Sequence, residues 1–181
     1  WGYFYMAADK ENSSCATGEG KTLRKSFIDG KLTSSKTDGS DKLALVRSLG
    51  ETKKAEGHLL LGYDDLYSIQ YFGENLRPYW NRNGNETIQS QFAKADKEYD
   101  AVMDKCAAFD ANLMKEATEV GGRKYAELCA LAYRQAIAAH KLVEAPNKDL
   151  LFLSKENFSN GSIGTVDITY PSAPLFLVYN P

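Results

Sequence analysis

The strongest constraint on the fold is a helical pattern with two unlike halves, separated by the glycine pair Gly121–Gly122. Before the pair, apolar residues recur at alternating spacings of four and three, which is typical of an amphipathic helix with one buried stripe. That stripe consists of Ile88, Phe92, Ala95, Tyr99, Val102, Cys106, Phe109 and Leu113. From Arg123 to Val143 apolar residues surround the axis, which predicts a helix buried on most sides. Because paired glycines disfavour a continuous helix, we expect two separate helices.

An amphipathic helix followed by a buried helix is the pattern of an outer and inner pair in an α/α toroid, where helical hairpins repeat around an axis. We expect Pro146 to end the second helix and a new apolar element to start at Pro174. The sequence therefore predicts an incomplete α/α toroid over residues 77–181. Its missing partner is expected to be the remainder of the same polypeptide, before Trp1 and beyond Pro181.

The first 76 residues have a different pattern, with short apolar runs between glycine-rich turns. We expect strands within residues 1–8, 43–49, 58–63 and 67–72, and no helix before about residue 72. So few strands suit the C-terminal part of a β-sandwich. The predicted fold class is α+β, with a β-rich segment over residues 1–76 followed by the helical segment.

Composition excludes several classes of function. The chain has 22 basic and 24 acidic residues, a net charge of -2 and no basic run, so we expect no nucleic-acid partner. No apolar run reaches the ~20 residues that span a bilayer. The three cysteines lack metal-ligand spacing and there are only two histidines, so no cofactor is expected.

The residues best suited to chemistry lie in a glycine-punctuated polar loop, Ser154–Pro171. Glu156 and Asp167 are candidates for the general acid and base of a hydrolysis. Lys155 is a candidate for binding an anion or lowering the pKa of a neighbouring carboxylate, and Asn157 for stabilising an oxyanion. In the alternative reading, the Asn and Asp side chains of the loop only bind its own backbone.

Other polar residues have both functional and structural interpretations. Arg134 and Gln135 interrupt the helix predicted to be buried, so Arg134 either binds a substrate carboxylate or bridges two helices. Asp64 and Asp65 are weak candidates for a cation site; alternatively they form a turn in which one carboxylate is salt-bridged. The aromatic pair at residues 79–80 either stacks on a sugar or seals a hinge.

Three segments resemble the glutaminase A-like proteins of bacteria and fungi: Gly62–Phe72, Ala132–Lys141 and Ser154–Pro181. The resemblance extends from about Leu43 to the end of the chain. It implies a β-sandwich followed by a toroid of the six-hairpin glycosidase type, and a secreted or periplasmic hydrolase that releases ammonia from L-glutamine. Arg134, Gln135, Glu156, Asn157, Asp167 and Tyr170 are nominated because they match these segments and suit the chemistry.

The expected function is therefore hydrolysis of the side-chain amide of glutamine by the full-length protein, with the 181 residues alone inactive. Arg134 would hold the α-carboxylate, and Glu156 or Asp167 would polarise water. One alternative is a carbohydrate-processing six-hairpin enzyme acting on a saccharide. The other is a binding or structural segment without catalysis.

Overall fold

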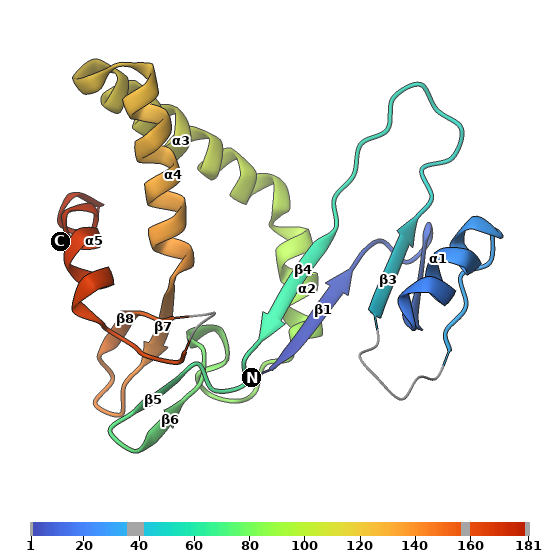
Figure 1. Cartoon of the computed structure of the whole chain (residues 1–181), viewed down its shortest axis with the longest axis horizontal. Coiled ribbons are helices and arrows are strands. Elements are labelled where there is room, and N and C mark those ends of the chain that lie inside the picture. Colours follow the sequence, from blue (N-terminus) through green and yellow to red (C-terminus); the bar gives the residue numbers. More distant parts are fainter. Residues whose placement is uncertain (1, 36–41, 157–159, 180–181) are drawn as a thin grey trace. The chain divides into compact units, whose positions relative to one another are not determined.

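The computed structural model describes residues 2–35, 42–156 and 160–179, and its chain divides into two compact units (Figure 1). The N-terminal unit is Tyr3–Asp64, and the C-terminal unit extends from Asp65 onward. The described residues form small two-stranded antiparallel sheets and five α-helices, which is an α+β architecture. The boundary expected between residues 76 and 77, the β-sandwich and the toroid stay predictions.

The N-terminal unit contains two strand pairs. Strand β1 (Tyr3–Ala7) pairs with β4 (Leu60–Asp64), and β2 (Ser13–Gly18) pairs with β3 (Lys42–Arg47). Strands β1, β3 and β4 overlap three of the expected ranges, which confirms those predictions. Ala16 of β2 is buried at the β2–β3 pair, opposite Ala44.

The expectation of no helix in this region was wrong, because α1 (Gly20–Ile28) follows β2. Its N-cap is Glu19, whose carboxylate accepts a hydrogen bond from the Thr22 backbone N–H at 2.8 Å. Leu23 is the buried residue of this helix. The flanking glycines suggested a turn, but the carboxylate cap stabilises a helix start there.

The C-terminal unit combines two β-hairpins with the other helices. Its elements in chain order are β5 (Ile69–Tyr71), β6 (Glu74–Leu76), the 3-10 turn η1 (Tyr79–Asn81), α2 (Ile88–Lys97), α3 (Tyr99–Gly121), α4 (Arg123–Ala138), β7 (His140–Glu144), β8 (Leu150–Ser154) and α5 (Val166–Tyr179). Strand β5 pairs with β6, and β7 pairs with β8. The buried core of this unit, Ile69, Leu76 and Val143, joins the two hairpins.

The helical prediction was correct at its start, Ile88, and at the glycine pair, but it missed a break at Glu98 and placed the end of the second helix too late. Helix α3 ends at Gly121, and Gly122 adopts a φ of 79° before α4 begins. The first predicted helix is two helices, since α2 ends before Glu98 and α3 starts after it. Helix α4 stops at Ala138 instead of reaching residue 143, because residues 140–144 pair with β8 as a strand.

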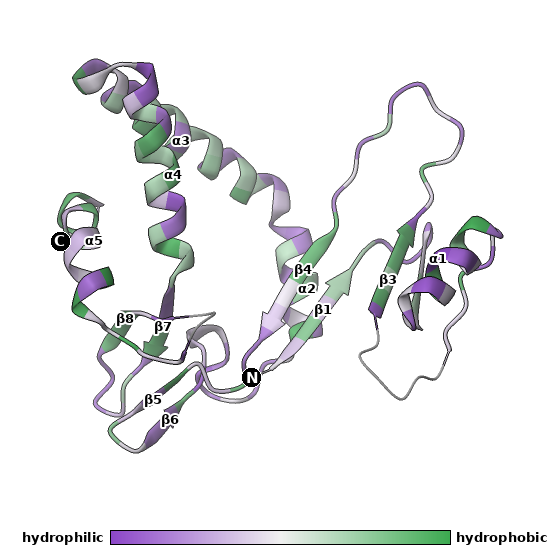
Figure 2. Ribbon diagram, in the orientation of Figure 1, coloured by the Kyte–Doolittle hydropathy of each residue, from purple (hydrophilic) through white to green (hydrophobic). Residues whose placement is uncertain are grey.

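The burial predicted for the helices is present only in part: Leu113 on α3 and Ala126 on α4 are buried in the described chain. Val102 and Cys106 of the apolar stripe are exposed on α3, as are Leu128 and Leu131 on α4. Helices α3 and α4 pack against each other, and Figure 2 shows that hydrophobic residues continue along α4 and α5. The exposed apolar surface arises because no described element covers the outer faces of this pair.

None of the helices in the described ranges combines the length and apolar character that crossing a bilayer requires.

Candidate functional site

A strained turn at the start of the C-terminal unit brings several polar residues together. Leu66 has a φ of 58°, a left-handed conformation that costs a bulky residue about 1–3 kcal/mol. Two hydrogen bonds close the turn: the Ser68 hydroxyl donates to Asp65 Oδ1 at 2.8 Å, and the Tyr67 N–H donates to the Asp65 carbonyl at 2.6 Å. Both polar side chains are buried, with exposed fractions of 9% for Asp65 and 1% for Ser68.

Two lysines reach this turn from the second hairpin. Lys155, which follows β8, donates its ammonium to the Ser68 carbonyl at 2.6 Å. Lys141, on β7, places Nζ 3.2 Å from Asp65 Oδ2. The Ser68 N–H donates to the Leu76 carbonyl at 2.8 Å, so Ser68 also joins the turn to β6. Ser68 therefore connects Asp65 and Lys155, two residues that the sequence had nominated separately.

Sequence reasoning missed Ser68 and Lys141. Both lie in segments that carry the family resemblance, Gly62–Phe72 and Ala132–Lys141, and that was the available signal. Lys141 was assigned to a helix, which gave no reason to place it beside Asp65. Its position in β7, opposite Leu153, turns it toward the buried carboxylate.

The loop after β8 is fixed at its base by backbone hydrogen bonds. The Lys155 N–H donates to the Ala139 carbonyl at 2.9 Å, and the Glu156 N–H donates to the Ser162 carbonyl at 3.0 Å. Lys155 and Ile163 also form an isolated β-bridge. Glu156 is half-buried at this base. The backbone at Glu156 is therefore bonded both to the end of α4, through Lys155, and to the returning part of the loop, through Ser162.

The two asparagines of the loop differ in what the structure describes. The Asn160 side chain accepts a hydrogen bond from the Ser162 N–H at 2.8 Å, as the structural alternative expected for this loop. Asn157 lies outside the described residues, so its assignment to substrate binding stays a prediction.

The predicted polar loop is shorter than expected, because α5 begins at Val166. Asp167 is therefore an exposed residue in the first turn of a helix, and Tyr170 is exposed on the same helix. Pro171 and Pro174 lack backbone N–H donors inside α5, and the Ser172 hydroxyl donates to the carbonyl of Ile168 at 3.0 Å. The Ser154 and Thr169 hydroxyls, 3.1 Å apart, link α5 to the end of β8.

Arg134 and Gln135 are exposed on α4, so the buried setting expected for them is wrong for the described chain. Arg134 lies on the same uncovered part of α4 as the exposed Leu131, so its guanidinium stays in contact with water and needs no buried partner. The Gln135 carbonyl accepts the N–H of Ala139, whose own carbonyl binds the Lys155 N–H. The last turn of α4 therefore adjoins the loop that carries Glu156.

The remaining candidates are engaged in protein contacts. Asp65 forms a salt bridge with Lys141, as expected if the Asp64–Asp65 pair belongs to a turn. No group of three or more potential metal ligands occurs among the residues described. The Arg82 guanidinium lies 4.3 Å from the centre of the Tyr79 ring and covers a surface that a sugar would need.

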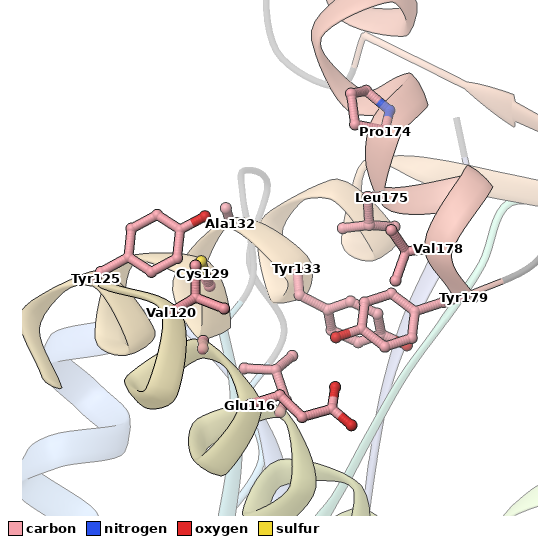
Figure 3. Close-up of a pocket in the computed structure, with 12 residues that line it drawn as sticks. Glu116, Val120, Tyr125, Cys129, Ala132, Tyr133, Pro174, Leu175, Val178 and Tyr179 are labelled. Carbon is pink, nitrogen blue, oxygen red and sulfur yellow. The ribbon is translucent and has the colours of Figure 1, made fainter. Parts of the chain in front are cut away.

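A separate cavity of about 460 Å³ lies between α3, α4 and α5 (Figure 3). Its walls are mainly apolar, and Glu116, Tyr133 and Tyr179 supply polar groups. Burial raises the pKa of Tyr179, and the Glu116 carboxylate raises it further. The Tyr133 and Tyr179 rings lie 5.4 Å apart and pack edge to face. This cavity suits an apolar occupant rather than hydrolytic chemistry.

Comparison with known protein families gives two matches that together cover most of the chain. Residues 1–116 match a domain of unknown function, DUF5127, and residues 122–181 match the glutaminase A six helical-hairpin domain.

Two fungal proteins are similar in sequence. Glutaminase A of Aspergillus oryzae is 28% identical over 195 aligned residues, which cover 100% of this chain and 28% of that protein. A probable glutaminase of Arthroderma benhamiae is 37% identical over 73 residues, which cover 40% of this chain and 8% of that protein. No solved structure matches the chain. With one family model spanning residues 1–116 and the relative aligned over its whole length, the chain belongs to the glutaminase A-like family.

Proposed function

We propose that the natural polypeptide carrying this chain is an amidohydrolase that converts L-glutamine to glutamate and ammonia. Membership of the glutaminase A-like family supports this activity. The observation that carries it is the fixed position of Glu156, whose backbone binds Ser162 and whose neighbour Lys155 binds the buried Ser68 carbonyl. Such a carboxylate on a supported loop base is suited to act on a bound water molecule.

Each nominated residue has a defined part in this reaction. Glu156 takes a proton from the attacking water, and Asp167, in its protonated carboxylic acid form, gives a proton to the amide nitrogen, which leaves as ammonia when the C–N bond breaks. Arg134 binds the α-carboxylate of glutamine through its planar fork. Gln135, Asn157 and Tyr170 provide hydrogen bonds to the substrate and to the developing oxyanion.

We extend the proposal to the fold and location. Helices α3, α4 and α5 form the first hairpins of an α/α toroid over residues 77–181, and residues 1–76 end a β-sandwich. The exposed apolar residues of α4 and α5 and the cavity between the helices support a further helical layer in the natural polypeptide. A secreted or periplasmic location belongs to the same proposal and rests on the family resemblance.

The test is ammonia release from L-glutamine by the natural polypeptide and its Glu156→Gln and Asp167→Asn variants. We expect each substitution to lower kcat by about 100-fold or more, because a lost acid or base costs about 10²–10⁴ in rate. Glu127→Gln is the matched control, since Glu127 lies on the surface of α4 and pairs with Arg123. Full activity in both site variants would refute the assigned roles.

A further inference from the structure

Asp65 is a buried carboxylate whose two oxygens have different partners. Oδ1 accepts the Ser68 hydroxyl at 2.8 Å. Oδ2 lies 3.2 Å from the Lys141 ammonium but accepts no hydrogen bond with good geometry from the described residues. Burying nine-tenths of a carboxylate costs free energy unless nearby cations and donors replace the lost contacts with water. The positive charge beside Asp65 is therefore the ammonium of Lys141, and not a bound metal ion.

Asp65 also supports an unfavourable backbone conformation, through its carboxylate and through its own backbone carbonyl. Leu66, next to Asp65, has a φ of 58°, and such conformations persist only where surrounding contacts determine them. The contacts here are the Ser68 hydroxyl and the Tyr67 N–H, which both bind Asp65. Their combined effect is to orient the Ser68 carbonyl, the atom to which Lys155 donates.

We infer that Asp65, Ser68 and Lys141 are positioning residues for the loop that carries Glu156. The Asp65–Lys141 pair holds the strained turn, the turn presents the Ser68 carbonyl, and that carbonyl binds the Lys155 ammonium. Lys155 is then a tether rather than a group that binds substrate directly. This assignment also replaces the cation-site interpretation of Asp65, and its effect on catalysis rests on the function proposed for Glu156.

The inference has a readout that does not require activity. The backbone amides of Lys155, Glu156 and Gly164 donate to the carbonyls of Ala139, Ser162 and Ser154. Their hydrogen exchange reports local opening of the loop base. The amide of Ala145, bonded to the Asp149 carbonyl in the β7–β8 turn, is an internal reference within the same unit.

The experiment compares residue-resolved hydrogen exchange in the natural polypeptide with that of Asp65→Asn, Ser68→Ala and Lys155→Met. Asp29→Asn is the matched control, because Asp29 forms an exposed ion pair with Lys25 in the N-terminal unit. We expect the three loop amides to exchange about tenfold faster or more in the site variants, with the Ala145 reference unchanged. Lys155→Arg, which restores a cationic donor, should return exchange toward the wild-type rate.

Ammonia release from L-glutamine is measured on the same proteins. We expect kcat to fall about 10- to 100-fold in Asp65→Asn and Lys155→Met while KM changes little, because misplacing a catalytic group weakens mainly the chemical step. Wild-type inactivity on glutamine would refute the proposed function, and the exchange result would still decide the positioning role.

Two results would overturn the inference. One is a folded Asp65→Asn protein whose loop amides exchange at the wild-type rate. The other is equal acceleration of the loop amides and the Ala145 reference, which indicates general destabilisation. If Asp65→Asn does not fold, Lys155→Met decides the matter, since it leaves the Asp65–Lys141 pair intact.

Discussion

Replacing Val143 by alanine tests whether the two hairpins of the C-terminal unit share one core. Val143 has an exposed fraction of 0% and lies between Ile69 and Leu76 of the first hairpin and Leu151 and Leu153 of its own. Losing the equivalent of two buried methylene groups, at about 0.8 kcal/mol each, removes about 1.6 kcal/mol. The cavity left behind raises the expected loss of unfolding free energy to about 2–3 kcal/mol.

The assay is urea and thermal unfolding of the 181-residue chain, followed by its tryptophan fluorescence, to which Trp80 of the same unit contributes. A loss of this size lowers the thermal midpoint by about 5–10 °C for a chain of this length. Val166→Ala is the control, because Val166 is 77% exposed at the start of α5. If Val143→Ala loses less than about 1 kcal/mol relative to this control, the shared core is wrong.

Phe72→Asn should raise stability by up to about 1 kcal/mol, because Phe72 has a φ of 46° in the two-residue turn before Gly73 and is 92% exposed; a lower urea midpoint would contradict the turn geometry. Stability of α1 should decrease in acid, because hydrogen bonds from the backbone N–H groups of Lys21 and Thr22 lower the pKa of Glu19 in the folded chain. That contribution is complete above the ordinary pKa of a glutamate and is lost as the pH falls through the lowered folded value. Hydrogen exchange in α1 measured against pH should show this loss, and Glu19→Gln should abolish the dependence.

Local patterns predicted the parts of the fold that depend on nearby residues. Strands β1, β3 and β4 and the helix break at Gly121–Gly122 follow from alternation and from glycine, which act over a few residues. Residues 140–143 were assigned to a helix, since Leu142 and Val143 continue the helical pattern of apolar residues before them. This segment is a strand because it pairs with β8, and a local sequence pattern does not specify which segment a strand pairs with.

The candidate site was predicted only in part, because local patterns indicate individual polar residues but not the contacts between distant ones. Lys155 and Glu156 were found from the composition of their loop, and Asp65 from its place beside another aspartate. Their connection through Ser68 depends on a hydrogen bond between residues 87 positions apart, which local patterns do not specify. Asp167 and Tyr170 were placed in the polar loop because its composition was taken to extend to Pro171, whereas α5 begins at Val166.

The most direct test of the central claim is an assay of the natural polypeptide carrying this chain on L-glutamine and, in parallel, on a panel of oligosaccharides. Ammonia and glutamate are quantified in the first case, and released reducing sugar in the second. The account predicts stoichiometric ammonia and glutamate from glutamine and no turnover of the oligosaccharides. Release of sugar without any release of ammonia would contradict it.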